Sequence, residues 1–418
     1  MSIVFLNRYF YPDHSATSQL LSDLAFGLSE CGYDVRVITS RQLYDAPAER
    51  LPAHEIIAGV DVRRVQTSRF GRNNLVGRAV DYLTFYLAGA WKLWRLARRG
   101  DFVIAKTDPP LLSVIAAPIA RWRGAQLINW LQDLFPEVAE VLGLNGRQPP
   151  GFVYDTLRNV RNQSLRSAIM NVVVGDGMAQ KIAAIGVAPD RVCIIQNWAD
   201  GVLIEPIAPA DNPLRSEWGL DGKFVVGYSG NLGRAHDYRT LLDAILLVED
   251  ATRGLLQISW LFIGGGALRV DFAKELRWRG LKSVTFKPYQ ARDRLAQSLS
   301  AADVHVVCLR PELEGLIVPS KFYGIAAAGR PAIFVGDRSG EIAREIERNN
   351  IGYVVSQGDG AGLATRVLAL ARDPDLCRQI GAKARLVCEE EFEKQVAIGR
   401  WEQLLARIHP HGHAGPLR

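Results

Sequence analysis

The sequence predicts an α/β protein made of two halves, each alternating short apolar strands with amphipathic helices. The first half opens with the apolar run Ile3–Leu6, then an amphipathic helix, then a strand at Asp34–Thr39. Such a βαβ opening implies a parallel sheet that binds ligands at the carboxyl ends of its strands. The alternation restarts at Lys223, after a stretch rich in proline and glycine, Gly201–Gly222, that we interpret as a linker. At 418 residues the chain is also too long for one typical domain.

Composition and cysteine usage exclude several classes of protein. The chain is 48% hydrophobic and 22% charged, with 38 Gly and 20 Pro, which is typical of a globular α/β protein. Its five cysteines are scattered without CxxC spacing, which indicates a reducing compartment and not a disulfide framework or a zinc site. A strand predicted from Ser2 leaves no room for a signal peptide, and no uncharged apolar run is long enough to span a bilayer. We therefore expect a cytoplasmic protein.

A basic region with many aromatic residues lies between Asp61 and Gly124. It holds twelve Lys or Arg against four Asp and no Glu, a local net charge of +8. A helix is expected from about Gly77 to Arg99, along which aromatic residues alternate with basic ones. Such a helix could lie at an anionic lipid surface. The same periodicity fits aromatic residues that fill a core behind a solvated basic face, so both interpretations stay open. The net charge of the whole chain, +6, does not by itself indicate nucleic acid.

Polar residues follow the predicted strands of the first half. Because parallel strands end at one edge of a sheet, these residues are candidates for a binding site there. The carboxylates among them can accept hydrogen bonds from hydroxyl groups, or can cap helices and occupy their first turns instead. The candidates are His14, Ser15 and Thr17 in the loop after the first strand, and Asp133 and Glu137 after the strand at Leu127–Leu131.

The second half opens with a candidate phosphate site, KFVVGYSGNLGRAHD, which begins at Lys223. A buried strand is followed by a glycine turn, by Arg234 and His236, and by Asp237 as the cap of a helix. A glycine turn at a helix N-terminus with Arg and His nearby suits a phosphate or diphosphate. The alternative is an ordinary βα turn with a solvated arginine.

Two further helix starts, at Ser320-Lys321 and Gly340-Glu341, repeat this anion-binding chemistry. A lysine in the first turn of a helix is unfavourable for the helix dipole, which makes sense if Lys321 faces an anion. Several such donors around a diphosphate would stabilise a leaving group without a metal. The chain has no GxxxxGK[ST] loop and no GxGxxG after its first strand. Its DxD, Asp373-Pro374-Asp375, is interpreted as a helix start and not as a metal site.

Several segments stand out by their order and spacing. They read QDLFPEVAEVLG, NWAD, YSGNLGRAHD, FIGGGALR, KPYQARDRL, AADVHVV and EGLIVPSKFYGIAAAGRP. Together they resemble the family 4 retaining glycosyltransferases, and most of all the subgroup that builds bacterial surface polysaccharides on lipid carriers. The resemblance implies a GT-B fold, in which two Rossmann-like domains face each other across a cleft. The implied parts are an acceptor-binding domain at 1–205, a nucleotide-sugar-binding domain at 206–390, a helix crossing back to the first domain at 391–408, and a flexible tail at 409–418.

The resemblance also implies roles for individual residues. Arg234 and Lys321 would bind the donor diphosphate beside His236, and Pro288 and Tyr289 would flank the base. The rest of the implied donor site consists of Gly230, Asn231, Gly233, Gly265 and Ser320, while Asp133 and Glu314 would lie beside the transferred sugar and His14, Ser15, Thr17 and Glu137 would bind the acceptor. The implied catalytic set is Asp133, Arg234, Glu314 and Lys321.

Two positions depart from the family pattern. Gln132 stands where many members have His, so the contact with the sugar differs there. Gly324 stands where the second glutamate of the E-x7-E motif would hold the ribose, so the nucleotide is held by another residue or in another way.

The function implied is transfer of a hexosyl or N-acetylhexosaminyl group, with retention, from a nucleotide-diphosphate sugar to a lipid-diphosphate-linked saccharide. The expectation includes no cofactor, no metal and no nucleic acid, and a cytoplasmic protein held at the inner face of the membrane by its basic aromatic region. Two alternatives stay open. One is a sugar-nucleotide 2-epimerase, which needs no membrane and no acceptor. The other is a non-catalytic nucleotide-sugar-binding subunit, which would explain the missing second glutamate.

Overall fold

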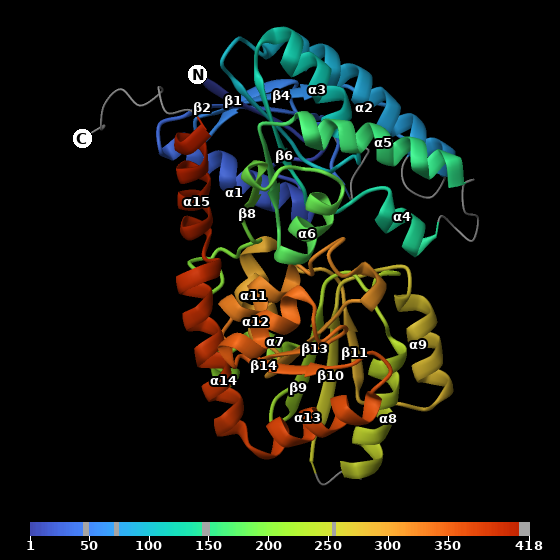
Figure 1. The fold of residues 1–418 in the computed structure, drawn as a ribbon. Helices are drawn as coiled ribbons and strands as arrows, with labels where there is room; N and C mark the ends of the chain where they lie inside the picture. Colours follow the sequence, from blue (N-terminus) through green and yellow to red (C-terminus); the bar gives the residue numbers. More distant parts are fainter. Residues whose placement is uncertain (45–49, 71–74, 144–150, 253–255, 409–418) are drawn as a thin grey trace. The chain divides into compact units, whose positions relative to one another are not determined.

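The computed structural model describes residues 1–44, 50–70, 75–143, 151–252 and 256–408 (Figure 1). These residues form two compact units. The first consists of Met1–Gln196 together with the helical residues from Ala397, and the second of Asn197–Val396. The tail predicted at 409–418 lies outside the described residues.

The first unit contains a sheet in which eight strands of the described residues are hydrogen-bonded side by side. Their order is β3 (His54–Ile57), β4 (Val60–Val65), β2 (Asp34–Ser40), β1 (Ser2–Leu6), β5 (Phe102–Ala105), β6 (Gln126–Trp130), β7 (Met170–Val173) and β8 (Val192–Ile194). Neighbouring strands are parallel except for β3 and β4. The order reverses beside β1, and in open α/β sheets the ligand lies outside the carboxyl ends of the strands at such a point.

Helices cover both faces of this sheet. They are α1 (Ala16–Glu30), α2 (Leu75–Leu96), α3 (Leu112–Arg123), α4 (Glu137–Leu142), α5 (Gly151–Ser167), α6 (Asp176–Ala184) and α15 (Lys394–Ile408), with a 3-10 turn at Pro189–Arg191. Successive side chains of a strand point to opposite faces. Val4 and Leu6 therefore pack on one face with residues of α2 and α3, which lie side by side in Figure 1. On the other face Trp130 meets Trp401 of α15, with ring centres 5.1 Å apart.

No prediction from the sequence covers the hairpin formed by β3 and β4. Its two-residue turn consists of Ala58 and Gly59, whose φ angles are 46° and 79°. Both values lie in the left-handed region that two-residue hairpin turns require. Gly59 adopts it freely, but alanine is not a usual turn residue, so the sequence carries only half of the hairpin signal.

The second unit holds a parallel sheet to which six strands of the described residues belong. Their order is β11 (Val284–Lys287), β10 (Ile258–Ile263), β9 (Phe224–Ser229), β12 (Val304–Cys308), β13 (Ala332–Val335) and β14 (Gly352–Val355). The order reverses beside β9. The glycine turn that follows β9 therefore lies at the point where such a sheet binds ligands.

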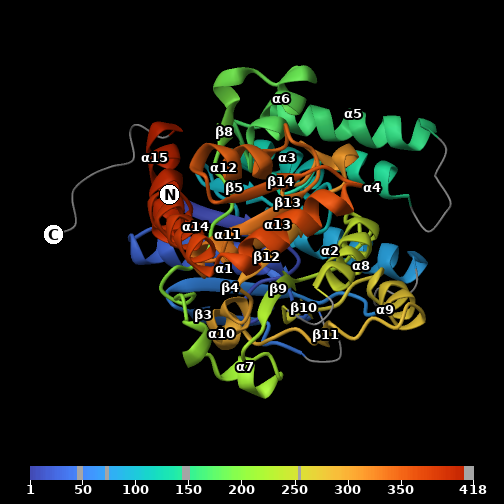
Figure 2. The same cartoon turned by 90° about the horizontal axis from the view of Figure 1, so that it is seen from below.

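The helices of this unit also lie on both faces. They are α7 (Pro213–Glu217), α8 (Arg239–Thr252), α9 (Arg269–Trp278), α10 (Leu295–Ser300), α11 (Lys321–Ala327), α12 (Glu341–Asn349), α13 (Gly360–Arg372) and α14 (Pro374–Val387), with 3-10 turns at Pro209–Asp211, Arg292–Arg294 and Pro311–Leu313 and a π turn at Cys388–Phe392. Apolar residues of α8, α9, α13 and α14 share one core with the strands. Figure 1 and Figure 2 both place α8 and α9 next to β10 and β11.

The interpretation of Gly201–Gly222 as a linker is wrong for its second part. Leu214 and Trp218 pack in a core cluster with residues of the sheet. Arg215 is buried and pairs with Asp303, with 3.1 Å between Nη1 and Oδ1. Proline and glycine mark turns in a sequence, but they do not show whether the turns are packed against a domain.

Candidate active site

A half-buried lysine lies at the end of the central strand of the second unit. Lys321 is the first residue of α11, and its Nζ donates a hydrogen bond to Tyr228 Oη at 2.8 Å. The same ammonium lies 3.9 Å from the centre of the Tyr228 ring. A Cβ placed on Gly230 would lie 3.9 Å from Nζ, so the lysine reaches the glycine turn after β9. None of the described carboxylates is recorded as an ion-pair partner of Lys321, and burial lowers its pKa to about 8.

His236 lies in the same turn and is held by the backbone. Its Nδ1 is 3.0 Å from Gly233 N and 3.2 Å from Gly233 O. The ring meets Tyr228 edge to face, with centres 6.0 Å apart. Burial, and then the charge of Lys321, lower the pKa of His236 to about 3. The imidazole is therefore neutral at pH 7, which leaves Lys321 as the cation beside it.

The glycine turns after β9 and β10 lie side by side. Leu232 N donates to Gly265 O at 2.8 Å. Gly264 has a φ of 123°, and a Cβ there would lie 3.0 Å from the ring of Tyr289, so only glycine suits the position. The exposed Tyr289 ring thus covers these glycines. The structure therefore brings together most of the predicted donor residues.

The other predicted donor residues lie beside these turns. Asn231 and Arg234 are exposed on the turn after β9, and Pro288 is exposed next to Tyr289. Ser320 precedes Lys321 at the start of α11 and makes no side-chain cap hydrogen bond. Their roles toward a donor stay predictions.

Glu314 occupies the helix start that we interpreted as an anion site. Its Oε2 accepts a hydrogen bond from Glu341 N at 3.4 Å, and its carboxylate fills the space that a side chain on Gly340 would need. The anion at Gly340-Glu341 is thus the protein's own side chain, which corrects the sequence interpretation. Burial raises the pKa of Glu314 to about 7. Its Oε1 is buried and has no hydrogen-bond partner among the described residues, so it is available to a hydroxyl group.

Gly324 lies on α11, where the family pattern has its second glutamate. A Cβ at this position would lie 3.4 Å from Leu299 Cδ1 and 3.9 Å from Ile204 Cδ1. A small side chain therefore fits there. The position as it stands offers a ribose no carboxylate.

In the first unit, Asp133 lines a small pocket after β6. The pocket also contains Lys106, Thr107 and Arg161. Asp133 Oδ1 is buried without a hydrogen-bond partner among the described residues. Burial raises the pKa of Asp133 to about 6, against a hydrogen bond from Thr107 that lowers it. The prediction places Asp133 beside a sugar, and an unsatisfied buried carboxylate oxygen is suited to accept a hydrogen bond from a hydroxyl group.

Lys106 is a buried cation that the sequence prediction missed. Its Nζ donates to Thr17 O at 2.9 Å and lies 3.7 Å from the centre of the Trp130 ring. Burial lowers its pKa, and the negative charges of Asp108, Asp23 and Asp133 oppose this shift. A lysine directly after the buried strand FVIA is the signal that could have revealed it.

The residues predicted to bind the acceptor have different surroundings, and their role toward an acceptor stays a prediction. His14 is exposed, and Ser15 precedes α1 with its amide bonded to Asp13 Oδ1 at 2.8 Å. The backbone carbonyl oxygen of Thr17 accepts a hydrogen bond from Lys106 Nζ. The Glu137 carboxylate accepts hydrogen bonds from both terminal nitrogens of the buried Arg161, at 2.5 and 3.2 Å. These contacts support a role for Glu137 in positioning Arg161 better than a role in which its carboxylate is free to bind the acceptor.

The DxD segment, Asp373-Pro374-Asp375, begins a helix. Asp373 Oδ1 accepts from Leu376 N at 3.0 Å and Pro374 is the first residue of α14, so the predicted helix start at the DxD is confirmed. Across the described ranges no three His, Cys, Asp or Glu side chains are grouped as a metal site. Across the same ranges, no helix combines the length and the apolar character needed to cross a bilayer.

The two units match two family models. Residues 17–198 match the Glycosyl transferase 4-like domain, and residues 223–373 match the Glycosyl transferases group 1. The chain belongs to the family 4 glycosyltransferases. This glycosyltransferase is 29% identical to the probable glycosyltransferase WbjE of Pseudomonas aeruginosa over 363 residues, 84% of this chain and 85% of that protein. It is 26% identical over 231 residues to the putative colanic acid biosynthesis glycosyl transferase WcaI of Escherichia coli strain K12, 55% of this chain and 56% of that protein.

Solved structures show the same fold. The sucrose-phosphate synthase of Thermosynechococcus elongatus gives a TM-score of 0.75 at 17% identity, over 98% of this chain and 100% of that one. Anabaena Alr3699/HepE in complex with UDP and glucose gives 0.71 at 18% identity, over 97% and 100%. At such identities the likeness concerns the fold alone. It confirms the predicted GT-B glycosyltransferase fold.

Proposed function

We propose that this glycosyltransferase moves a sugar from a nucleotide-diphosphate sugar to a lipid-diphosphate-linked saccharide, with retention at the anomeric carbon, during surface polysaccharide biosynthesis. The observation that carries the proposal is the half-buried Lys321 beside the glycine turn after β9, which has no ion-pair partner among the described carboxylates. A partly desolvated ammonium in such a place is stabilised when it meets an anion. A structural neighbour and a relative add support, since HepE was solved with UDP and glucose and WcaI is named for colanic acid biosynthesis.

The reaction depends on stabilising the negative charge that develops on the leaving diphosphate. The bond between the anomeric carbon and the diphosphate oxygen breaks, while Lys321, Arg234 and backbone N–H groups stabilise the negative charge that develops. The acceptor hydroxyl attacks from the same face and forms the new glycosidic bond. Its proton passes to the departing phosphate, so the step needs neither a dedicated base nor a metal. The sugar transferred is a hexosyl or N-acetylhexosaminyl group.

Two carboxyl groups are suited to hold the sugars. Glu314 Oε1 and Asp133 Oδ1 are both buried without a hydrogen-bond partner among the described residues. Both also have a pKa raised by burial, to about 7 and about 6. Each can accept a hydrogen bond from a hydroxyl group, Glu314 from the donor sugar and Asp133 from the sugars at the acceptor side.

The donor class is tested by thermal stabilisation of the purified protein with UDP, GDP, TDP and ADP, each with magnesium and with a chelator. We expect one diphosphate to raise the unfolding temperature equally in both conditions, because Lys321 supplies the positive charge that a metal would otherwise supply. Stabilisation by none of the four would contradict the assignment of Lys321 and Arg234. Stabilisation only with magnesium would contradict metal independence.

The proposal also places the protein at a membrane through the surface formed by α2 and α3. Phe85 and Leu93 of α2 are buried in the core. Other apolar residues of α2, spaced three, four or seven positions apart, form an exposed stripe along the helix. The exposed residues are Val76, Leu83, Leu87, Trp91 and Trp94 of α2, together with Trp122 of α3. The core interpretation is thus confirmed for Phe85 and Leu93, and the lipid interpretation stays a proposal for the exposed residues.

Basic groups accompany the exposed tryptophans. Trp122 stacks on Trp94 with ring centres 6.0 Å apart. The guanidinium of Arg95 lies 5.0 Å from the centre of the Trp91 ring, and that of Arg123 lies 5.9 Å from Trp94. Indole rings flanked by arginine suit the boundary between headgroups and acyl chains of an anionic leaflet. We therefore propose peripheral binding at the cytoplasmic face of the membrane, where a lipid-linked acceptor would be found.

Replacing Trp91, Trp94 and Trp122 together by Ser is expected to weaken binding to phosphatidylglycerol vesicles at least tenfold, because three interfacial anchors are lost. Co-sedimentation measures the affinity. The matched control is Trp278→Ser, which removes a tryptophan of the second unit that is 82% exposed and also lies beside an arginine. Equal binding by the triple variant and the unchanged protein would contradict this docking surface.

Neither alternative function is favoured. Both matched families are glycosyltransferases, and so are the relatives described above. A 2-epimerase would also leave the exposed tryptophans of α2 and α3 without a role. A non-catalytic subunit would leave the two unpartnered carboxyl oxygens, of Asp133 and Glu314, unused.

A further inference from the structure

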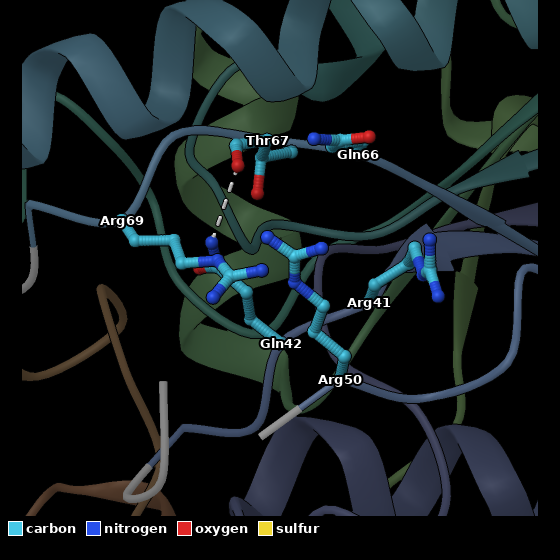
Figure 3. Close-up of a pocket in the computed structure, with 6 residues that line it drawn as sticks. All are labelled: Arg41, Gln42, Arg50, Gln66, Thr67 and Arg69. Carbon is cyan, nitrogen blue, oxygen red and sulfur yellow. Dashed lines mark hydrogen bonds between the residues drawn. The ribbon is translucent and has the colours of Figure 1, made fainter. Parts of the chain in front are cut away.

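A second basic pocket lies in the first unit, away from the residues given a role above. It is found where β2 and β4 end. Its lining consists of Arg41, Gln42, Arg50, Gln66, Thr67 and Arg69 (Figure 3). Three of these six residues are arginines. In Figure 3 the guanidinium groups of Arg50 and Arg69 point toward each other below Thr67.

Hydrogen bonds between loops build the frame of this pocket. Gln42 follows β2, and its Nε2 donates to Ser68 O at 2.7 Å and to Thr67 O at 3.4 Å, in the segment after β4. Arg8 Nη2 donates to Gln42 Oε1 at 3.4 Å. Arg41 Nε donates to Leu51 O at 2.8 Å. The loops after β1, β2 and β4 are therefore tied together around the pocket.

Among the residues that the structure describes, no carboxylate compensates the charge inside the pocket. No ion pair joins Arg41, Arg50 or Arg69 to a carboxylate within the described ranges. Two described acidic groups near the pocket are engaged elsewhere. Asp81 lies 3.5 Å from Arg8 and accepts from Ser68 Oγ at 2.6 Å, and Glu55 pairs with Arg64.

A polar side chain inside the pocket also lacks a partner. Thr67 is nearly buried, and its Oγ1 makes no hydrogen bond to the described residues. Figure 3 shows this hydroxyl directed toward the guanidinium of Arg50. Like charges gathered around an unsatisfied hydroxyl are stabilised when an anion binds between them. Guanidinium groups match the oxygens of a phosphate group in particular.

We propose that this pocket binds the diphosphate of the lipid-linked acceptor. The pocket lies at the same edge of the sheet as the pocket of Asp133, because β2 and β6 are parallel members of one sheet. Three strand spacings separate the ends of β2 and β6, or about 14 Å. This leaves room for a short saccharide between a diphosphate at the arginines and a hydroxyl at Asp133. The anion site stands on the geometry alone, while its assignment to the acceptor rests on the proposed function.

The first test measures the anion site itself. Inorganic pyrophosphate is titrated into the full chain carrying Lys321→Met, so that the donor site lacks its lysine. Adding Arg50→Gln and Arg69→Gln to this protein is expected to weaken pyrophosphate binding at least tenfold. The control adds Arg98→Gln and Arg99→Gln instead, which removes two exposed charges from the same unit. Equal weakening by both pairs, or by neither, overturns the site.

The second test identifies the source of the phosphate. In the otherwise unchanged enzyme, R50Q/R69Q is expected to raise KM for a lipid-diphosphate saccharide at least tenfold and to leave KM for the donor unchanged. If instead the variant keeps its KM for the acceptor but loses affinity for phosphatidylglycerol vesicles, the ligand is a phospholipid headgroup and the acceptor assignment is overturned. If the unchanged enzyme transfers sugar to no lipid-diphosphate acceptor, the proposed function fails, and the pyrophosphate titration still decides the anion site.

Discussion

Replacing Lys321 by Met is expected to lower kcat/KM for sugar transfer by a factor on the order of 10²–10³ while the protein stays folded. The lost ammonium is the half-buried cation at the switch point of the second sheet, where negative charge would develop on the leaving diphosphate. Methionine has a similar length and needs no hydration, so the core keeps its packing. Tyr228 Oη retains its hydrogen bond to Asn231 O at 3.2 Å.

The unfolding temperature separates this effect from misfolding. Burial holds the pKa of Lys321 at about 8, below its unfolded value. The charged form therefore destabilises the folded protein at pH 7, and the cost disappears as the pH rises above 8. Lys321→Met should accordingly unfold at the same or a higher temperature at pH 7. Lys274→Met, at an exposed position on α9, is the control and should keep full activity. Full activity in Lys321→Met would contradict the assignment.

Much of the candidate donor site in the second unit could be predicted because its residues follow continuous apolar strands. A run such as FVVGY is typical of a buried strand, which predicts that the glycines, Arg234 and His236 after it lie at the edge of the sheet. Lys321 was identified by the cost of placing a lysine in the first turn of a helix. These inferences need only local sequence and the general rule for α/β sheets.

The partners of these residues could not be predicted, because tertiary packing decides them. Nothing in the sequence shows that Tyr228 lies under the ammonium of Lys321, or that Glu314 occupies the start of α12. Lys106 escaped notice for the same reason, since Trp130 reaches it only through the pairing of β5 and β6. The pocket of Arg50 and Arg69 likewise joins loops from separate strands.

Asp133→Asn is expected to lower kcat/KM for transfer about 100-fold and to leave nucleotide binding unchanged. Asparagine preserves the size of the side chain, but its amide donates hydrogen bonds at one of the two positions where the carboxylate accepts them. Oδ1 of Asp133 is buried and unpaired among the described residues, so the carboxylate is the group a sugar hydroxyl would meet. Initial rates with saturating donor measure the loss. Asp190→Asn, on an exposed 3-10 turn, is the matched control.

The pH profile distinguishes a substrate contact from a structural one. Burial raises the pKa of Asp133 to about 6, so transfer by the unchanged enzyme should rise as the pH increases through 6 and fall only above pH 8, where Lys321 loses its charge. Asp133→Asn should lose this limb. A raised pKa also means that the stability contributed by Asp133 is present at low pH and lost as the pH rises through 6, so the Asn variant should be at least as stable at pH 7. A variant that keeps full activity, or that keeps the limb near pH 6, would show that another group accepts the hydroxyl and that the unpaired Oδ1 of Asp133 is only a feature of the empty pocket.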